Sequence, residues 1–230
     1  MFFSTPMIFS NGGEIFDSTF SKTLLDQPAD REVIQKIKDL RTVHGVTPEA
    51  RFLEQAGMSA TQMLQTGKVA MIINGSWALQ ELAQMNFKVG VGVLPVFKQL
   101  VTTEGAHVHA VYKGTKHPKE AWRLVSFLSS EWYQLELVRA GLWMPNRMAL
   151  YTSEGVKKWL NPKVHPEEFV NMIPYYTNYV RVYPFVFLPS KIQDTIIEEL
   201  DYFWSGDEPL DNVMPRLTNR VNSMLTEWKK

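Results

Sequence analysis

The sequence predicts an α/β fold built on a mainly parallel sheet. Three apolar stretches of strand length, at residues 69–73, 87–97 and 107–115, alternate with segments of helical periodicity. Two further helical patterns close the chain. Strands that alternate with helices favour a parallel sheet covered by helices. In such sheets, ligands bind beyond the carboxyl ends of the strands, where helices begin.

The composition is that of an ordinary globular protein of 230 residues. Apolar residues make up 45% of the chain and charged residues 21%, which argues against a disordered chain. Lys+Arg and Asp+Glu number 24 each, so we expect no nucleic-acid or anionic-membrane surface. No apolar run is long enough to span a membrane. The absence of cysteine excludes disulfides and thiolate metal sites, and we expect neither a cofactor nor a metal.

The first residues are apolar, but they do not have the pattern of a signal peptide. No Lys or Arg precedes them and Pro6 interrupts them, so we predict a strand or loop that ends at a turn over residues 11–13. Next comes a helix over residues 28–43, which begins at a proline and stops before Gly45. A shorter helix is predicted over residues 60–65.

The second half of the chain is mostly helical in pattern. After the first apolar strand, a helix is predicted over residues 77–84. A long helix is predicted over residues 118–140, because apolar residues recur there at helical spacing. Residues 161–189 mix short helix with loop. The two closing helices are predicted over residues 192–203 and 210–228.

The segment TGKVAMIINGSWAL, residues 66–79, places a tryptophan in the first turn of a predicted helix. Tryptophan is only a middling helix former, so helix initiation does not explain Trp77. One interpretation is a core residue, because most aromatic side chains serve packing. The other is a platform on which a sugar ring lays its apolar face while Asn74 bonds the hydroxyl groups.

Several segments together resemble the family 1 extracellular solute-binding proteins of ABC transporters. They are MIFSNGGEIFD, GKVAMIINGSW, KVGVGVLPVF, GTKHPKEAWRLVSFLSS, GLWMPNR and SGDEPLDNVMPRLTNRVNSML. The resemblance rests on their order and spacing rather than on any single motif, and it extends over nearly all of the chain.

The resemblance implies a periplasmic-binding-protein type II-like fold, in which two α/β lobes hold the ligand in a cleft. Residues 1–103 and 143–230 are expected to form most of the C-terminal lobe, and residues 104–142 an excursion that belongs to the N-terminal lobe. Family members are much longer, so we expect a C-terminal fragment without most of the N-terminal lobe. The helix that carries Trp122 and Phe127 would then expose an apolar face that invites self-association.

The function implied by the resemblance is the sugar-binding component, for an oligosaccharide, of an ABC importer. Such a protein closes on its ligand and docks on permease subunits, at a periplasmic or extracellular location, without catalysing a reaction. One alternative is a stand-alone interaction module derived from such a lobe. Another is a carbohydrate-active enzyme, which needs two facing carboxylates, but no motif places Glu81 and Glu104 in that role.

The resemblance also suggests which residues bind the ligand. Trp77 matches the family's stacking platform, and Phe2 falls where a stacking tyrosine stands in a relative. Trp143 is either a second platform or a hinge packing residue. Arg181 and Tyr183 lie in a predicted loop that closes over the ligand in relatives. There Arg181 either binds sugar hydroxyls or a carboxylate, or forms a surface salt bridge.

Two histidines form an H-x-H pair on a predicted strand. His107 and His109 would point to the same face and could supply half of a metal site. No third ligand stands at a useful spacing, so no metal is predicted. His107 is kept as a candidate contact to a ligand hydroxyl.

Overall fold

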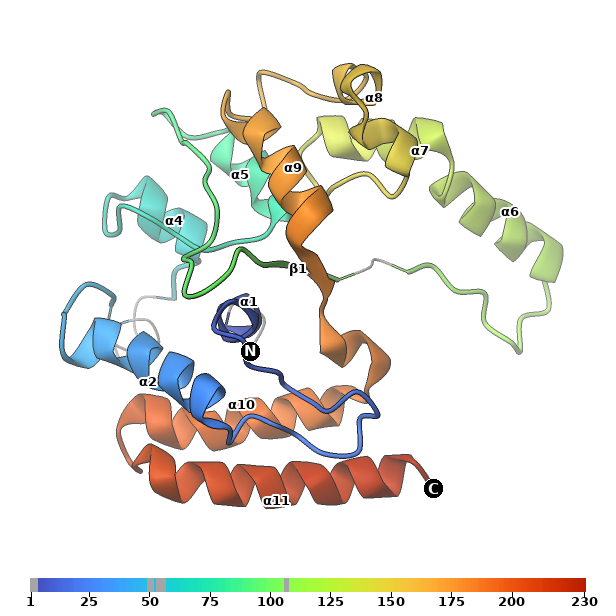
Figure 1. Ribbon diagram of the computed structural model, residues 1–230. Coiled ribbons are helices and arrows are strands. Elements are labelled where there is room, and N and C mark those ends of the chain that lie inside the picture. Colours follow the sequence, from blue (N-terminus) through green and yellow to red (C-terminus); the bar gives the residue numbers. More distant parts are fainter. Residues whose placement is uncertain (1–3, 49–51, 53–56, 106–107) are drawn as a thin grey trace. The chain divides into compact units, whose positions relative to one another are not determined.

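The computed structural model describes residues 4–48, 52, 57–105 and 108–230 (Figure 1). The chain divides into two compact units, each of which is assembled from separate stretches of sequence. Unit 1 comprises Met1–Ser59, Val93–Gly105 and Tyr179–Lys230, and unit 2 comprises Ala60–Gly92 and Ala106–Asn178.

Unit 1 contains a helical layer and a small parallel sheet. In chain order its elements are α1 (Thr5–Ser10), α2 (Pro28–Thr42), β1 (Thr102–Glu104), β2 (Val180–Val182), η3 (Pro184–Phe187), α10 (Ser190–Ser205) and α11 (Leu210–Trp228). The structure confirms the helices predicted over residues 28–43, 192–203 and 210–228.

The long helices α10 and α11 pack side by side and form the most extensive contact between two elements of unit 1 (Figure 1). On α10 the predicted apolar face is buried, and on α11 a matching stripe is buried. The connection turns at Gly206, whose φ of 91° suits glycine at the end of a helix. The buried residues of the two stripes are Ile192, Ile196, Leu200, Phe203, Val213, Leu217, Val221 and Leu225.

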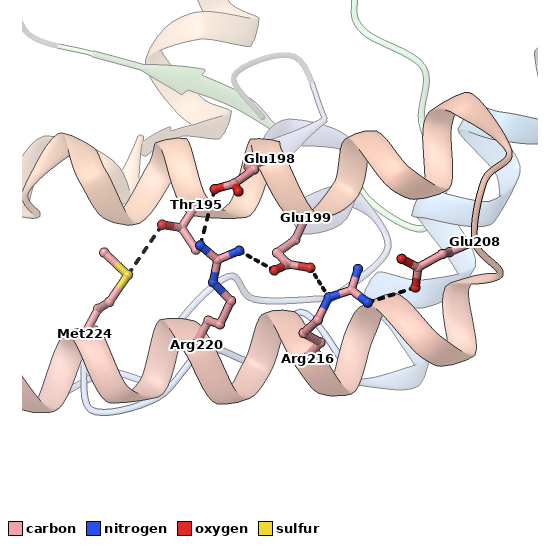
Figure 2. A network of polar contacts seen from close by, with 7 residues as sticks. All are labelled: Thr195, Glu198, Glu199, Glu208, Arg216, Arg220 and Met224. Atoms are coloured by element: carbon pink, nitrogen blue, oxygen red, sulfur yellow. Dashed lines mark hydrogen bonds and ion pairs between the residues drawn. The ribbon is translucent and has the colours of Figure 1, made fainter.

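A buried carboxylate joins the same two helices (Figure 2). The side chain of Glu199 on α10 is only 1% exposed and accepts hydrogen bonds from Arg216 (2.6 Å) and Arg220 (2.5 Å) on α11. Arg216 also pairs with Glu208 at 2.8 Å. Burial by itself would raise the pKa of Glu199, but the two arginine hydrogen bonds outweigh it and lower the pKa. The ionised pair therefore ties α10 to α11.

The sheet differs from the predicted one. β1 and β2 are parallel, with Thr103 opposite Arg181, whereas the sequence predicted a loop at β2 and no strand at β1. The described parts of the three predicted strands (69–73, 87–97 and 108–115) form no strand. A segment forms a strand only when a neighbouring segment completes its backbone hydrogen bonds. An apolar run indicates that a segment is buried, but it does not show which segment lies beside it.

The prediction for the N-terminus was also wrong, because residues 5–10 form helix α1 instead of a strand or loop. Pro6 lies in the first turn of this helix. Backbone N–H groups in the first turn have no partner within the helix, so the missing N–H of a proline costs no hydrogen bond there. Every residue of α1 is buried. The apolar pattern thus reports a helix that is covered on all sides.

Unit 2 is helical in its described residues. Its elements are α4 (Ala60–Gln65), η1 (Ser76–Ala78), α5 (Leu79–Leu82), α6 (Pro118–Leu128), α7 (Glu131–Arg139), η2 (Met148–Tyr151), α8 (Ser153–Lys157) and α9 (Phe169–Tyr179), whose last residue lies in unit 1. The prediction over residues 60–65 is confirmed by α4. The helix predicted over residues 118–140 is divided into α6 and α7, because Ser130 caps a new helix by accepting a hydrogen bond from the Tyr133 N–H.

The core of unit 2 gathers around the buried Trp159. Its indole N–H donates to the Leu150 carbonyl at 2.8 Å, so the ring is satisfied within the core. By contrast, α6 has no buried residue, although its apolar side chains cover a wide arc. No helix in the described ranges is long and apolar enough to cross a membrane.

Candidate functional site

Trp77 stands at the surface of unit 2, on the short helix η1. Its side chain is 46% exposed, while the next residues, Ala78 and Leu79, are buried and anchor the segment. The indole folds back over Gly75, so closely that a methyl group there would overlap the ring. The observed position of the Trp77 ring therefore requires a glycine at position 75. A residue that exposed is not an ordinary core residue.

Asn74 supports the same turn. Its side-chain oxygen accepts a hydrogen bond from the Gly75 N–H at 2.9 Å. The amide group thus fixes the backbone immediately before η1. The helix predicted over residues 77–84 is in fact η1 followed by the four residues of α5, so the segment is shorter than the sequence suggested.

Trp143 lies in the loop that follows α7 and is partly buried. Together with Met144 it packs against the core cluster of unit 2 that contains Trp159. The ring therefore serves packing and retains some exposure. The contacts are with the core of unit 2, and the choice between a second platform and hinge packing stays a prediction.

Arg181 lies on β2 and forms a salt bridge, as one of the two interpretations predicted. Its Nη2 lies 2.8 Å from the Glu14 Oε2, and both side chains are partly exposed. The guanidinium carbon lies 3.7 Å from the centre of the Phe9 ring, in a cation–π contact. The sequence pattern did not single out Glu14. The only signal in the sequence is that Glu14 directly follows the Gly12-Gly13 turn, which sets the course of the backbone at this residue.

Tyr183 is buried in unit 1 just after β2. Its backbone N–H donates to the Glu104 carbonyl at 2.8 Å, and its ring lies 5.1 Å from that of Phe185. Burial raises the pKa of the Tyr183 hydroxyl to about 12. The segment predicted as a loop is β2 and η3, and its tyrosine belongs to the unit 1 core.

The structure therefore groups the predicted residues by unit. Asn74, Trp77 and Trp143 belong to unit 2, whereas Arg181 and Tyr183 belong to unit 1. Phe2 and His107 lie outside the described residues. Within the described ranges, no group of three or more His, Asp or Glu side chains could hold a metal ion.

Two shallow hollows lie on the described surface of unit 1. One is bordered by the C-terminal part of α10, and the other lies along α2 and the connection to α11. Neither is lined by a residue that the sequence singled out for ligand binding.

Comparison with known proteins places the chain in a class. Residues 1–163 match the family described as bacterial extracellular solute-binding protein, and the chain belongs to this family. Among curated proteins there is no match.

Two solved structures share the fold. The first is the ABC substrate-binding protein Lmo0181 from Listeria monocytogenes in complex with cycloalternan, with a TM-score of 0.81, 18% identity and 97% of this chain covered. The second is the maltose-bound MalE3 of T. maritima, with a TM-score of 0.77, 22% identity and 95% of this chain covered. The chain spans 56% of the length of each. The likeness confirms the predicted periplasmic-binding-protein type II-like α/β fold.

Proposed function

We propose that this chain is part of the sugar-binding component of an ABC importer and that Trp77 is its stacking platform. One observation carries the proposal: the Trp77 indole is nearly half exposed and is held in place by its contact with Gly75. Family membership and the sugars bound in the two similar structures support it. The ligand we propose is an oligosaccharide.

The proposed mechanism is binding without a change of covalent bonds. The apolar face of a sugar ring lies on the indole, and the Asn74 amide of the same unit bonds its hydroxyl groups. Trp143 adds a second, smaller apolar surface, and we propose His107, which belongs to the same unit, as a further contact. Neither this mechanism nor the family gives the chain an enzymatic role.

In the whole importer, we propose, the loaded binding protein docks on permease subunits at a periplasmic or extracellular location. Residues 1–103 and 143–230 would form most of one lobe, and residues 104–142 would belong to the other. The exposure of α6 supports this, because Trp122 is 65% exposed on a helix without any buried residue. The rest of that other lobe, packed on this face of α6, would shield the face from water.

The proposal is tested by saturation-transfer NMR on the chain with a maltooligosaccharide at millimolar concentration. We expect weak binding, because the chain spans only part of the relatives. Trp77→Ala should abolish most of the transfer to the sugar C–H protons. Trp122→Ala is the matched control, since it removes another exposed indole of the same unit.

A second variant, Gly75→Ala, keeps the indole but forces it out of its position over the backbone. It should weaken the transfer as well, although less than loss of the ring. Equal transfer in the wild type and in Trp77→Ala, or equal loss in Trp122→Ala, would refute the assigned platform.

A further inference from the structure

The carboxyl group of Asp30 is buried in the first turn of α2. The residue is 1% exposed, and neither oxygen has a hydrogen-bond partner within the described part of the chain. The group lies directly on Gly13, where an added methyl would stand 2.7 Å from the Asp30 Oδ2. Buried carboxylates are normally paired, so this setting is unusual.

The contact belongs to a junction between the turn after α1 and the first turn of α2. Asn11 forms one side, since its Nδ2 donates to the Ala29 carbonyl at 2.8 Å and to the Glu32 Oε2 at 3.0 Å. The carboxyl of Asp30 against Gly13 forms the other side. The glycine provides the space that the carboxyl occupies.

Charged groups around the junction are engaged elsewhere. Glu14 pairs with Arg181 on β2, and the Lys98 Nζ donates to the Asn11 carbonyl at 3.0 Å. Arg31, next to Asp30 on α2, pairs with Asp26 and Asp211. Glu32 accepts the Asn11 bond and lies near Lys36. Asp30 thus has a like charge, Glu14, as its neighbour, and no cation among the described residues pairs with it to offset its own charge.

An ionised carboxylate in such a place is unfavourable, because burial removes water and supplies no partner. Burial raises the pKa of Asp30 to about 7, and the nearby Glu14 charge adds to the rise. The N–H groups of Asp30 and Glu14 oppose the rise in part, although neither has hydrogen-bond geometry with the carboxyl. The protonated, neutral form of the Asp30 carboxyl group is therefore the form that this buried position favours.

We propose that Asp30 is a pH-responsive latch, which holds the Gly12-Gly13 turn against α2 when neutral and releases it when ionised. The folded chain keeps a proton that the unfolded chain loses near pH 4. Stability from this group is therefore complete in acid and falls as the pH rises through neutrality. Because Glu14 follows Gly13, release of the turn would also shift the Glu14–Arg181 ion pair. An effect of this shift on ligand affinity rests on the proposed function.

The latch is tested by NMR titration of the side-chain carboxyls in the full 230-residue chain, together with thermal unfolding between pH 5.5 and 8.5. The Asp30 carboxyl should titrate near pH 7. The Tm of the wild type should fall across this range by about 5 °C or more relative to Asp30→Asn, which mimics the neutral acid. Asp39→Asn, on the same helix, is the control and should keep the wild-type slope.

An Asp30 midpoint below pH 5, or an Asp30→Asn slope equal to that of the wild type, would overturn the latch. If Asp30→Asn does not fold, the wild-type titration decides alone. Neither readout involves a sugar. A chain that titrates as expected but binds no oligosaccharide would contradict the proposed function and leave the latch standing.

Discussion

The helix pair α10–α11 of unit 1 and the helix α6 of unit 2 differ in how completely they bury their apolar side chains. In unit 1, α10 and α11 bury matching stripes and add a buried ion pair between them. In unit 2, a core forms around Trp159, but α6 exposes Trp122, Leu124 and Phe127. An apolar helix face costs free energy in water unless something covers it. The comparison therefore separates a pair of helices that bury their apolar faces against each other from a helix whose apolar face stays exposed.

The largest effect is expected from the α10–α11 contact. Ile196→Ala removes a fully buried side chain and should lower the free energy of unfolding by about 3 kcal/mol. Its neighbour Ile197 is 37% exposed, so Ile197→Ala should cost much less. Denaturant unfolding measures both variants. Equal losses would mean that α10 does not bury one face against α11 as described.

The buried ion pair should come next. Glu199→Gln leaves Arg216 and Arg220 without their shared carboxylate and should cost about 2 kcal/mol, because both arginines remain partly exposed. Glu198→Gln on the same helix turn is the control, since Glu198 is exposed and should contribute little. The lowered pKa of Glu199 also predicts that its contribution is lost in strong acid. If the free energy of unfolding of Glu199→Gln declines in strong acid as steeply as that of the wild type, this prediction is contradicted.

A smaller effect in unit 2 has the opposite pH sign to that of Asp30. His165 is buried between Trp159 and Phe169, and its Nδ1 lies 3.0 Å from the Asn161 N–H. Burial lowers the pKa of His165 despite backbone hydrogen bonds that favour the charged form. The unfolded chain then binds more protons in mild acid, so stability should fall as the pH drops below about 6.5.

NMR titration of the imidazole C–H signals measures this directly. The His165 signal should titrate below the ordinary histidine value of about 6.5. His165→Asn should flatten the stability curve between pH 5 and 7, whereas His117→Asn should not. A His165 midpoint at or above the ordinary histidine value would argue against a buried neutral imidazole.

The smallest change in stability is expected on α6. Trp122→Gln should alter the free energy of unfolding by less than about 0.5 kcal/mol, because the ring already lies in water. It should also reduce self-association in sedimentation at high protein concentration, since it interrupts the apolar face. A loss above 2 kcal/mol would show that the face is covered within the chain, and the contrast between α6 and the α10–α11 pair would fail.

The helices were predictable because their signals are local. The 3.6-residue periodicity located α2, α10 and α11, and it named the buried face of α10 correctly. The break between α6 and α7 was missed, since a cap at Ser130 competes with a continuous apolar pattern. Strands depend on partners far away in the sequence. The pairing of Thr103 with Arg181 could not be derived from either segment alone.

The candidate site divides in the same way. The sequence identified Trp77 as unusual, and the structure adds a physical reason for the glycine in front of it. Both interpretations of Arg181 were open, and its ion pair with Glu14 depends on a turn 167 residues away along the chain. The buried state of Asp30 gave no sequence signal, because an acid in the first turn of a helix is ordinarily exposed and favourable.

The central claim, that the Trp77 indole receives a sugar face, is tested most directly by fluorine NMR of the chain labelled with 5-fluorotryptophan. The chain has seven tryptophans, and single substitutions assign their signals. During titration with a maltooligosaccharide, the Trp77 signal should move furthest, while that of the buried Trp159 stays fixed. If Trp77 stays fixed at the highest sugar concentration, or only Trp122 and Trp132 respond, the claim is contradicted.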